Sequence, residues 1–360
     1  MNKLTIDYLK QALSLAELHR GFCAPNPCVG AIVVKDKKII ASGYHLGSSF
    51  PHAEAEALNK IDSQLAKDAT LYVTLQPCCH TAKKTPPCTQ LLIEKGIAKV
   101  IYGFRDPNPA VENQTDIILK QAGISCTYHP IPEIDRFYTS YKFWWQHKRP
   151  FVTAKLAISL DGKIAGQNGQ RIQLTGEIAQ HFTHQQRKKA DALLTTVKTI
   201  CNDNPLLNVR THTENIAKPV YILDSELHTP LLANVFNKAK NVTIFYKAGL
   251  DKKKHEKHIQ NNVRLVPIKH SNQGLNLLEA LKQIGKDGYH DLWIEAGGHC
   301  LQSFAINQLL QRAFIYVAPY WLGQTAQIAF TYPDVLSTSK SASPIFLGPD
   351  VCFEFNWYTK

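Results

Sequence analysis

The chain has no long hydrophobic run. No stretch of its 360 residues approaches the eighteen or more uninterrupted apolar side chains that indicate a transmembrane helix. The first seven residues, Met1 to Asp7, lack the apolar core and the small-residue cleavage site of a signal peptide. We therefore expect a cytoplasmic protein with no membrane partner.

A disulfide framework is also missing. The nine cysteines are an odd number, and they are spread thinly over a long chain. They are Cys23, Cys28, Cys78, Cys79, Cys88, Cys126, Cys201, Cys300 and Cys352. Only the group from Cys78 to Cys88 lies in a turn-rich segment of the kind that holds a metal, so we expect most of the others to be small buried side chains.

The formal net charge of +12 permits nucleic acids or phosphorylated small molecules as partners. The basic residues are dispersed in short clusters such as 35–38 and 252–254, which are typical of solvated loops. There is no stripe of Lys and Arg interleaved with aromatic residues. Charge alone therefore does not define a partner.

Two domains are expected, because 360 residues exceed what a single compact core usually holds. Strand-like and helix-like segments alternate in both halves, which predicts an α/β fold. A helix over 131–145 is followed by Lys148-Arg149-Pro150 and then by a new apolar strand over 151–159. We place the boundary there, with an N-terminal domain over 1–147 and a C-terminal domain over 148–360.

One group of residues predicts a metal site. His52 and Glu54 begin a helix, Cys78 follows the predicted strand 69–75, and Cys88 begins another helix. Histidine and cysteine thiolate suit tetrahedral zinc, and three protein ligands leave a fourth position for water. A single histidine at a helix start is more often a capping residue, and a single cysteine is more often just buried. Their joint occurrence favours zinc.

The same residues indicate a chemistry. Zinc-dependent deaminases carry H-x-E followed by P-C-x-x-C. The first half fits, whereas ten positions separate Cys78 from Cys88. Zinc lowers the pKa of its bound water towards about 7, giving hydroxide at neutral pH. Glu54 is placed to take that proton and return it to the departing amine, so the residues predict hydrolytic deamination of a pyrimidine-like ring.

The surrounding motifs resemble a known family, the bifunctional deaminase/reductases of riboflavin biosynthesis. The matching segments are Pro25-Asn26-Pro27, Val29-Gly30-Ala31, Pro51-His52-Ala53-Glu54, Tyr72-Val73-Thr74-Leu75, Pro77-Cys78-Cys79-His80, Thr85-Pro86-Pro87-Cys88 and Asp106-Pro107-Asn108-Pro109. The long loop between the cysteines is a mark of that family. The resemblance implies a cytidine-deaminase-like domain in which His52, Cys78 and Cys88 bind Zn²⁺. It further implies that Glu54 is the proton shuttle and that Asn26 contacts a phosphorylated aminopyrimidine substrate.

Two departures from the family pattern lie next to this site. The family usually has Glu before Pro-Cys, where this chain has Gln76. The loop between the cysteines is one residue longer, so Cys79 stands at the commoner spacing from Cys88. The ligand can therefore be Cys78 or Cys79, and its place directly after the proline favours Cys78.

The C-terminal half resembles the reductase of the same family, a dihydrofolate-reductase-like fold. The matching segments include 154–163, 174–176, 203–206, 209–210 and 294–298. The resemblance implies NADPH against Ala157, Gln173, Thr199, Asp203, Gly297 and Gly298. It implies a ribityl-phosphate-type substrate against Arg171, Arg187, Leu207, Arg210 and Glu295. The residues alone give weaker support for NADPH and a phosphorylated substrate. A glycine pair at a strand end allows close approach to a phosphate, and arginines can bind phosphate through two hydrogen bonds. The sequence has no G-x-G-x-x-G motif.

Departures are more numerous in this half. Arg171-Ile172-Gln173 replaces the usual Ser-x-Trp, Thr196-Val197-Lys198-Thr199 replaces Gly-x-Gly-Thr, and Gln311-Arg312 replaces an acidic pair. The reductase could therefore be active with changed affinity, or it could be a silent structural partner.

The resemblance implies two consecutive reactions. The first is deamination of 2,5-diamino-6-(5-phosphoribosylamino)pyrimidin-4-one, and the second is NADPH-dependent reduction of its ribosyl group to ribityl. An active deaminase with a catalytically silent second domain is one alternative. A basic deaminase that binds nucleic acid is another, and it predicts salt-dependent RNA binding. The long loop and the second domain fit the riboflavin family better, so we expect no nucleic-acid partner, and we expect a homo-oligomer.

Overall fold

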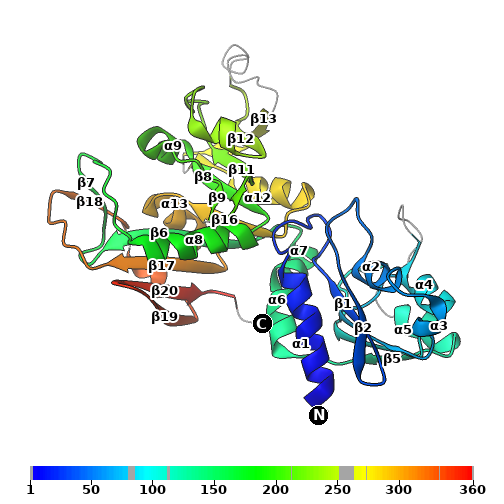
Figure 1. Ribbon diagram of the computed structural model, residues 1–360. Coiled ribbons are helices and arrows are strands. Elements are labelled where there is room, and N and C mark those ends of the chain that lie inside the picture. The colour runs from blue at the N-terminus through cyan, green and yellow to red at the C-terminus, as the bar shows by residue number, and fades with distance from the viewer. Residues whose placement is uncertain are drawn as a thin grey trace. The chain divides into compact units, whose positions relative to one another are not determined.

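The computed structural model describes residues 3–79, 86–111, 114–211, 213–250, 263–272, 274–331 and 333–358. The chain divides into two compact units, Met1–Lys148 and Arg149–Lys360 (Figure 1). The division falls one residue past the boundary expected from the sequence. Each unit has its own sheet and its own hydrophobic core, as the α/β prediction requires.

The N-terminal unit is built on a five-stranded sheet with the order β2-β1-β3-β4-β5. Its strands are β1 Gly30–Lys35, β2 Lys38–Tyr44, β3 Thr70–Leu75, β4 Lys99–Phe104 and β5 Ser125–Tyr128. β1 pairs antiparallel with β2 and β3, whereas β3, β4 and β5 are parallel. β1, β3 and β4 are buried almost throughout, as is typical of strands covered on both faces.

Helices cover both faces of this sheet (Figure 1). They are α1 Lys3–Glu17, α2 Ala53–Leu58, α3 Ser63–Ala66, α4 Cys88–Glu94, α5 Thr115–Gln121, α6 Pro132–Phe137 and α7 Thr139–His147. Gly30 lies against α1, where an added Cβ would be 2.0 Å from the Ala12 carbonyl oxygen. Gly43 lies against α2, where a Cβ would be 2.3 Å from the Ala53 oxygen. Gly30 pairs with Tyr44, so Gly43 faces the other side of the sheet, and α1 and α2 cover opposite faces.

The single helix expected over 131–145 is instead two helices, α6 and α7. They meet at Tyr138, whose backbone leaves the helical conformation with φ −89° and ψ 7°. The Tyr138 hydroxyl is anchored in the core, 2.7 Å from Thr74 Oγ1 and 2.9 Å from the Cys28 carbonyl oxygen. Because those partners lie far away in the sequence, local periodicity could not indicate the break.

The C-terminal unit contains a nine-stranded sheet with the order β13-β12-β11-β8-β16-β6-β17-β20-β19. Its strands are β6 Phe151–Ser159, β8 Ala192–Thr196, β11 Pro219–Leu223, β12 Asn241–Lys247, β13 Val263–Ile268, β16 Asp291–Glu295, β17 Arg312–Ala318, β19 Ser341–Leu347 and β20 Asp350–Asn356. All neighbours from β13 to β17 are parallel, and β20 and β19 extend the sheet antiparallel. β16 lies between β8 and β6, although it follows both in the sequence.

Two hydrophobic clusters cover the two faces of this sheet. α8 Glu177–Lys189, α9 Val197–Asp203 and α10 Asn234–Lys238 contribute to one cluster, and α12 Leu277–Lys286 and α13 Gly298–Ile306 contribute to the other. The short elements are the pairs β7 Lys163–Gln167 with β18 Ala326–Ile328, β9 Val209–Arg210 with β10 Asn215–Ile216, and β14 His270–Ser271 with β15 Gly274–Leu275, together with the 3₁₀ helix η1 Pro333–Leu336. Within the described ranges, no helix is long and apolar enough to cross a membrane.

Candidate zinc centre and reductase site

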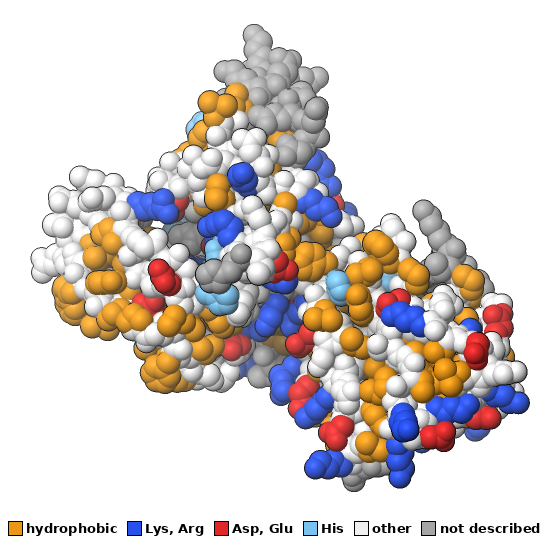
Figure 2. Space-filling view, in the orientation of Figure 1, with side chains coloured by type: hydrophobic (Ala, Val, Ile, Leu, Met, Phe, Trp, Pro, Cys, Tyr) orange, Lys and Arg blue, Asp and Glu red, His pale blue; other side chains and the backbone are white. Residues whose placement is uncertain are grey.

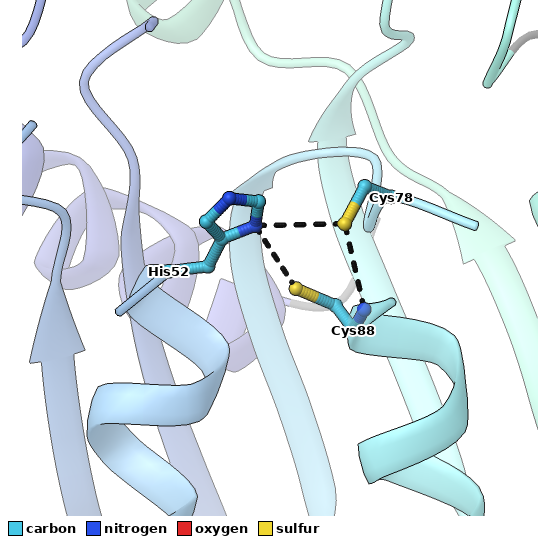
Figure 3. Close-up of side chains that lie close together, drawn as sticks. All are labelled: His52, Cys78 and Cys88. Carbon is cyan, nitrogen blue, oxygen red and sulfur yellow. Dashed lines mark hydrogen bonds between the residues drawn. The ribbon is translucent and has the colours of Figure 1, made fainter. Parts of the chain in front are cut away.

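The three residues predicted to bind a metal meet at one point (Figure 3). His52 caps the start of α2, Cys78 follows β3, and Cys88 is the first residue of α4. His52 Nδ1 lies 3.2 Å from Cys88 Sγ and 3.5 Å from Cys78 Sγ, and all three ligand atoms lie within 4.8 Å of one another. Tetrahedral zinc with bonds of 2.0–2.3 Å holds its ligand atoms about 3.3–3.8 Å apart. The donor set and its spacing therefore fit zinc.

Backbone contacts hold the turn that carries Cys78. The Thr115 hydroxyl donates a 2.7 Å hydrogen bond to the Pro77 carbonyl oxygen, and the Thr89 N–H donates to the Cys78 oxygen across 3.2 Å. The Cys88 N–H donates to Cys78 Sγ across 3.4 Å. The sulfur thus faces the amino end of α4, which favours its thiolate form.

The two thiols share one environment but differ in acidity. The hydrogen bond from Cys88, together with neighbouring His52, lowers the pKa of Cys78 despite its burial. The hydrogen bond with Cys78 and burial raise the pKa of Cys88. Zinc takes cysteine as thiolate, so metal binding favours the deprotonated form of both sulfurs.

Cys79 lies apart from this cluster. Its sulfur donates to the Ala110 carbonyl oxygen at 3.6 Å, on the turn that follows β4. Of the two cysteines left open by the sequence, the geometry brings Cys78 to His52.

Glu54 lies in the wall of the same pocket. Its side chain is buried, and this burial raises the pKa of its carboxyl group above the ordinary value, although His52 opposes the shift. A carboxyl group whose pKa is raised by burial releases its proton less readily than an exposed one, which favours proton exchange with a bound ligand. This environment suits the proton carrier that the H-x-E spacing predicted.

The pocket opens to solvent and holds about 690 Å³ of empty space including its open mouth. Its lining combines polar side chains with an aromatic wall from α7: Asn26, His45, Gln76, Asp106, Asn108, Tyr141, Trp144 and Trp145. Of these, only Asn26 was predicted from the sequence. The others come from separate segments, and only the fold brings them together.

His45 fixes the orientation of Asn26. His45 Nδ1 lies 2.8 Å from the Pro51 carbonyl oxygen, which can only accept, so Nδ1 carries the proton. His45 Nε2 must then accept from Asn26 Nδ2, 3.0 Å away. Asn26 is thereby turned so that its carbonyl oxygen is the group that can accept a hydrogen bond from a ligand.

In the C-terminal unit, Arg187 and Glu295 form a buried ion pair. Arg187 Nη2 donates to Glu295 Oε2 across 2.8 Å, and Arg187 Nε makes a second contact with the same carboxylate. Trp293 Nε1 donates to Glu295 Oε1 across 2.7 Å. Burial alone would raise the pKa of Glu295, but Arg187 lowers it to about 2. Both residues were predicted to contact substrate, and the structure pairs them with each other.

Lys155, which the sequence reasoning missed, lies beside this pair. Burial lowers the pKa of its amine, whereas Glu295 acts in the opposite direction. Its Nζ is 5.2 Å from the centroid of the Tyr316 ring. A buried lysine with a lowered pKa is a candidate functional group. The available signal was a lysine in the middle of the largely apolar strand β6.

The other predicted substrate residues have different surroundings. The Arg210 guanidinium contacts Asn208 Oδ1, and the Arg210 backbone N–H donates to His184 Nδ1 across 3.1 Å. The Leu207 side chain packs in the hydrophobic core, so only its backbone could reach a substrate.

Five of the six predicted cofactor residues lie on neighbouring parallel strands or directly after them, whereas Gln173 lies in the segment between β7 and α8. Ala157 is in β6, Thr199 and Asp203 are in α9 after β8, and Gly297 and Gly298 begin α13 after β16. The order β8-β16-β6 places the carboxyl ends of these strands together, where chain connections diverge and where α/β sheets bind ligands. An added Cβ on Gly297 would meet nothing within 4 Å, so backbone is exposed there to an approaching phosphate. These residues fit NADPH.

Two residues of the Arg171-Ile172-Gln173 segment, which departs from the family pattern, contact other residues of the C-terminal unit. Arg171 Nε lies 3.9 Å from Asp203 Oδ1, and Gln173 Nε2 donates to the Thr175 carbonyl oxygen across 3.0 Å. Packing within the protein also requires a glycine at position 298, because a Cβ there would lie 1.7 Å from the Ala329 carbonyl oxygen.

Comparisons with known proteins agree with the two-unit organisation. Residues 3–104 match the family model described as the cytidine and deoxycytidylate deaminase zinc-binding region, and residues 150–353 match the RibD C-terminal domain. The chain is thus a zinc-binding deaminase domain joined to a RibD-type reductase domain, and the predicted fold class is confirmed.

Full-length relatives specify the family. The chain is 37% identical to the riboflavin biosynthesis protein RibD of Aquifex aeolicus over 89% of each protein. It is 31% identical to that of Escherichia coli over 96% of this chain and 97% of the relative. The Acinetobacter baumannii RibD structure superposes with a TM-score of 0.86 at 29% identity, covering 98% of this chain and 99% of that one. This chain belongs to the RibD family.

Proposed function

We propose that the N-terminal unit deaminates 2,5-diamino-6-(5-phosphoribosylamino)pyrimidin-4-one and that the C-terminal unit reduces the ribosyl group of the product to ribityl with NADPH. The observation that carries the proposal is the His52, Cys78 and Cys88 cluster with buried Glu54 beside it, in a chain that matches RibD through both halves. The Thermotoga maritima diaminohydroxyphosphoribosylaminopyrimidine deaminase/5-amino-6-(5-phosphoribosylamino)uracil reductase is a further structural neighbour, 28% identical with a TM-score of 0.85.

In the deaminase, zinc held by His52, Cys78 and Cys88 supplies a Lewis acid that lowers the pKa of water. Glu54 accepts the proton of the attacking water and delivers it to the nitrogen that leaves as ammonia. The carbonyl oxygen of Asn26, oriented by His45, accepts a hydrogen bond from an amino group of the substrate. Trp144 and Trp145 shield the pyrimidine ring from solvent.

In the reductase, NADPH bound at the carboxyl ends of β6, β8 and β16 would supply a hydride to the ribosyl carbon bonded to nitrogen. Opening of the ribose ring at that carbon would leave the ring oxygen in need of a proton. Lys155 is the candidate donor, because it is buried beside Glu295 and its pKa is lowered. Arg187 orients Glu295, whereas Arg210, which lies nearby on β9, is the candidate for the substrate phosphate.

Mass spectrometry of the products tests both units. With the diaminopyrimidine phosphate alone, exchange of an amine for a carbonyl is expected. With NADPH added, a further gain of two hydrogens is expected. An unchanged substrate mass would overturn the deaminase assignment.

A catalytically silent reductase is the second candidate, motivated by the departures from the family pattern at Arg171 and Gln173. It predicts the first mass change without the second.

The phosphorylated aminopyrimidine, rather than nucleic acid, is the proposed partner. Support comes from the pocket and from the surface. On the face drawn in Figure 2, Lys and Arg side chains of the N-terminal unit lie among Asp and Glu side chains. RNA binding that is tight at physiological salt would contradict this proposal.

A further inference from the structure

Gln76, the residue that replaces the family's usual glutamate, is the centre of a buried hydrogen-bond chain. Its Nε2 donates to Asp116 Oδ1 across 3.0 Å, and its Oε1 accepts from the Asp106 backbone N–H across 3.3 Å. Its own backbone N–H donates to the Phe104 carbonyl oxygen across 2.9 Å. The side chain is only 3% exposed, so these contacts replace its hydration.

The chain of contacts reaches both sides of the deaminase pocket. Asp106 Oδ1 accepts from the Asn108 N–H at 2.9 Å and from the Tyr141 hydroxyl at 3.1 Å, and all three residues line the pocket. On the other side, Gln76 precedes Pro77 and Cys78, and Thr115 of α5 holds the Pro77 oxygen. The first turn of α5 therefore holds two turns of the pocket. One is the turn at Pro77 and Cys78, which carries a metal ligand, and the other is the Asp106–Asn108 turn, which lines the pocket.

The chemistry at Asp116 requires a donor at position 76. Asp116 also accepts from the Tyr102 hydroxyl at 2.9 Å and from Cys126 Sγ at 3.5 Å, so its carboxylate receives three donors. A glutamine supplies a donor towards Asp116 and an acceptor towards the Asp106 N–H. A carboxylate at position 76 would place two acceptors about 3 Å apart with no donor between them, which is costly for buried groups.

We propose that Gln76 and Asp116 are a matched positioning pair of the deaminase. Neither touches the reacting atoms. Together they hold Cys78 and the Asp106–Asn108 turn in the geometry that binds metal and substrate. An amide at position 116 can compensate for a carboxylate at position 76, because the exchange reverses the donor and the acceptor and leaves Tyr102 an oxygen to donate to.

The inference rests on the proposed deaminase function, so the test has one readout that needs no substrate. Full-length zinc-loaded protein is prepared as wild type, Gln76→Glu, Asp116→Asn and the double variant. The rate of zinc release to a chromogenic chelator is measured beside kcat and KM for deamination. A matched control is Gln90→Glu, since Gln90 also donates to a carboxylate, that of Glu94 at 2.9 Å, but on the exposed face of α4.

Gln76→Glu is expected to release zinc at least tenfold faster and to lose at least tenfold in kcat/KM, through both a lower kcat and a higher KM. Asp116→Asn is expected to change both quantities in the same direction, because its single carbonyl oxygen leaves either Gln76 Nε2 or the Tyr102 hydroxyl without an acceptor. Gln90→Glu is expected to stay within threefold of wild type. The double variant is expected to recover both quantities to within threefold.

A Gln76→Glu enzyme that matches wild type in both readouts, or a double variant no better than the single one, would overturn the pairing. So would an equal effect of the exposed Gln90→Glu change. If Gln76→Glu does not fold, a folded and zinc-retaining double variant supports the pairing, and a double variant that also fails to fold overturns it. If the wild type does not deaminate, the proposed function fails, while the zinc-release rates still decide the pairing.

Discussion

In the C-terminal unit, both carboxylate oxygens of Glu295 accept hydrogen bonds from the guanidinium of Arg187. The two side chains are only 14% and 11% exposed. Removing one partner of such a pair leaves an uncompensated buried charge, which costs about 3–5 kcal/mol. Glu295→Gln is therefore expected to lower the stability of this unit by that amount, measured by amide hydrogen exchange in β16. Glu214→Gln, which breaks the exposed Lys188–Glu214 bridge, is the control and is expected to cost less than about 1 kcal/mol.

The same pair predicts a pH dependence. The pKa of Glu295 is lowered to about 2 in the folded protein, from an ordinary value of 4.5. Its contribution to stability is therefore fully present above about pH 4.5 and is lost as the pH falls towards 2. The stability difference between wild type and Glu295→Gln should shrink over that range. A difference that stays constant from about pH 6 to about pH 3 would contradict the ion-pair account.

The metal ligands are tested by zinc content. Cys78→Ser is expected to lose the zinc, because it removes one of three protein ligands. Cys79→Ser is expected to keep about one zinc per chain, because its sulfur is directed to the Ala110 oxygen. Metal analysis of the purified proteins measures both. Equal zinc loss in the two variants would refute the assignment of Cys78.

Glu54→Gln separates proton transfer from metal binding. The amide cannot carry the proton, so deamination is expected to fall about 10²–10⁴-fold while zinc content stays at the wild-type value. Glu94→Gln, an exposed acid on α4, is the matched control and should leave the rate unchanged. Loss of zinc in Glu54→Gln would show that this carboxylate helps to hold the metal.

The adjacent glycines at the start of α13 should respond differently to alanine. Gly298→Ala places a Cβ against the Ala329 backbone, so a loss of about 1–3 kcal/mol of stability is expected. Gly297→Ala meets no protein atom, so stability should change by less than about 0.5 kcal/mol. If Gly297 faces the cofactor, its variant should instead raise the KM for NADPH. Thermal unfolding and NADPH titration distinguish the two effects.

The deaminase centre could be predicted because its chemistry is concentrated in short segments. His52 and Glu54 are two residues apart, and Cys88 starts a helix directly after two prolines. The pocket wall could not be predicted in this way, because Trp144 is near His52 only through the fold. Gln76 stands out in the sequence as a departure, but its role depends on Asp116, forty residues later.

The reductase half was harder to predict for a related reason. The alternation of strand-like and helix-like segments and the apolar strand over 151–159 were expected, and both are found. The order of the strands in the sheet could not be predicted, because β16 and β17 pair with β6 across more than 130 residues. Lys155 lies within a segment that resembles the family's first reductase strand, and only its burial beside Glu295 reveals its environment.

The late insertion of β16 between β8 and β6 has a consequence for synthesis on the ribosome. Every strand of the N-terminal sheet is translated by residue 128, so that unit can close early. The C-terminal sheet cannot, because the strand that joins β6 to β8 begins about 130 residues after β6 ends. Until Glu295 leaves the exit tunnel, two strand edges destined for the middle of the sheet remain open. The nascent second unit therefore keeps unpaired strand edges exposed for longer than the first.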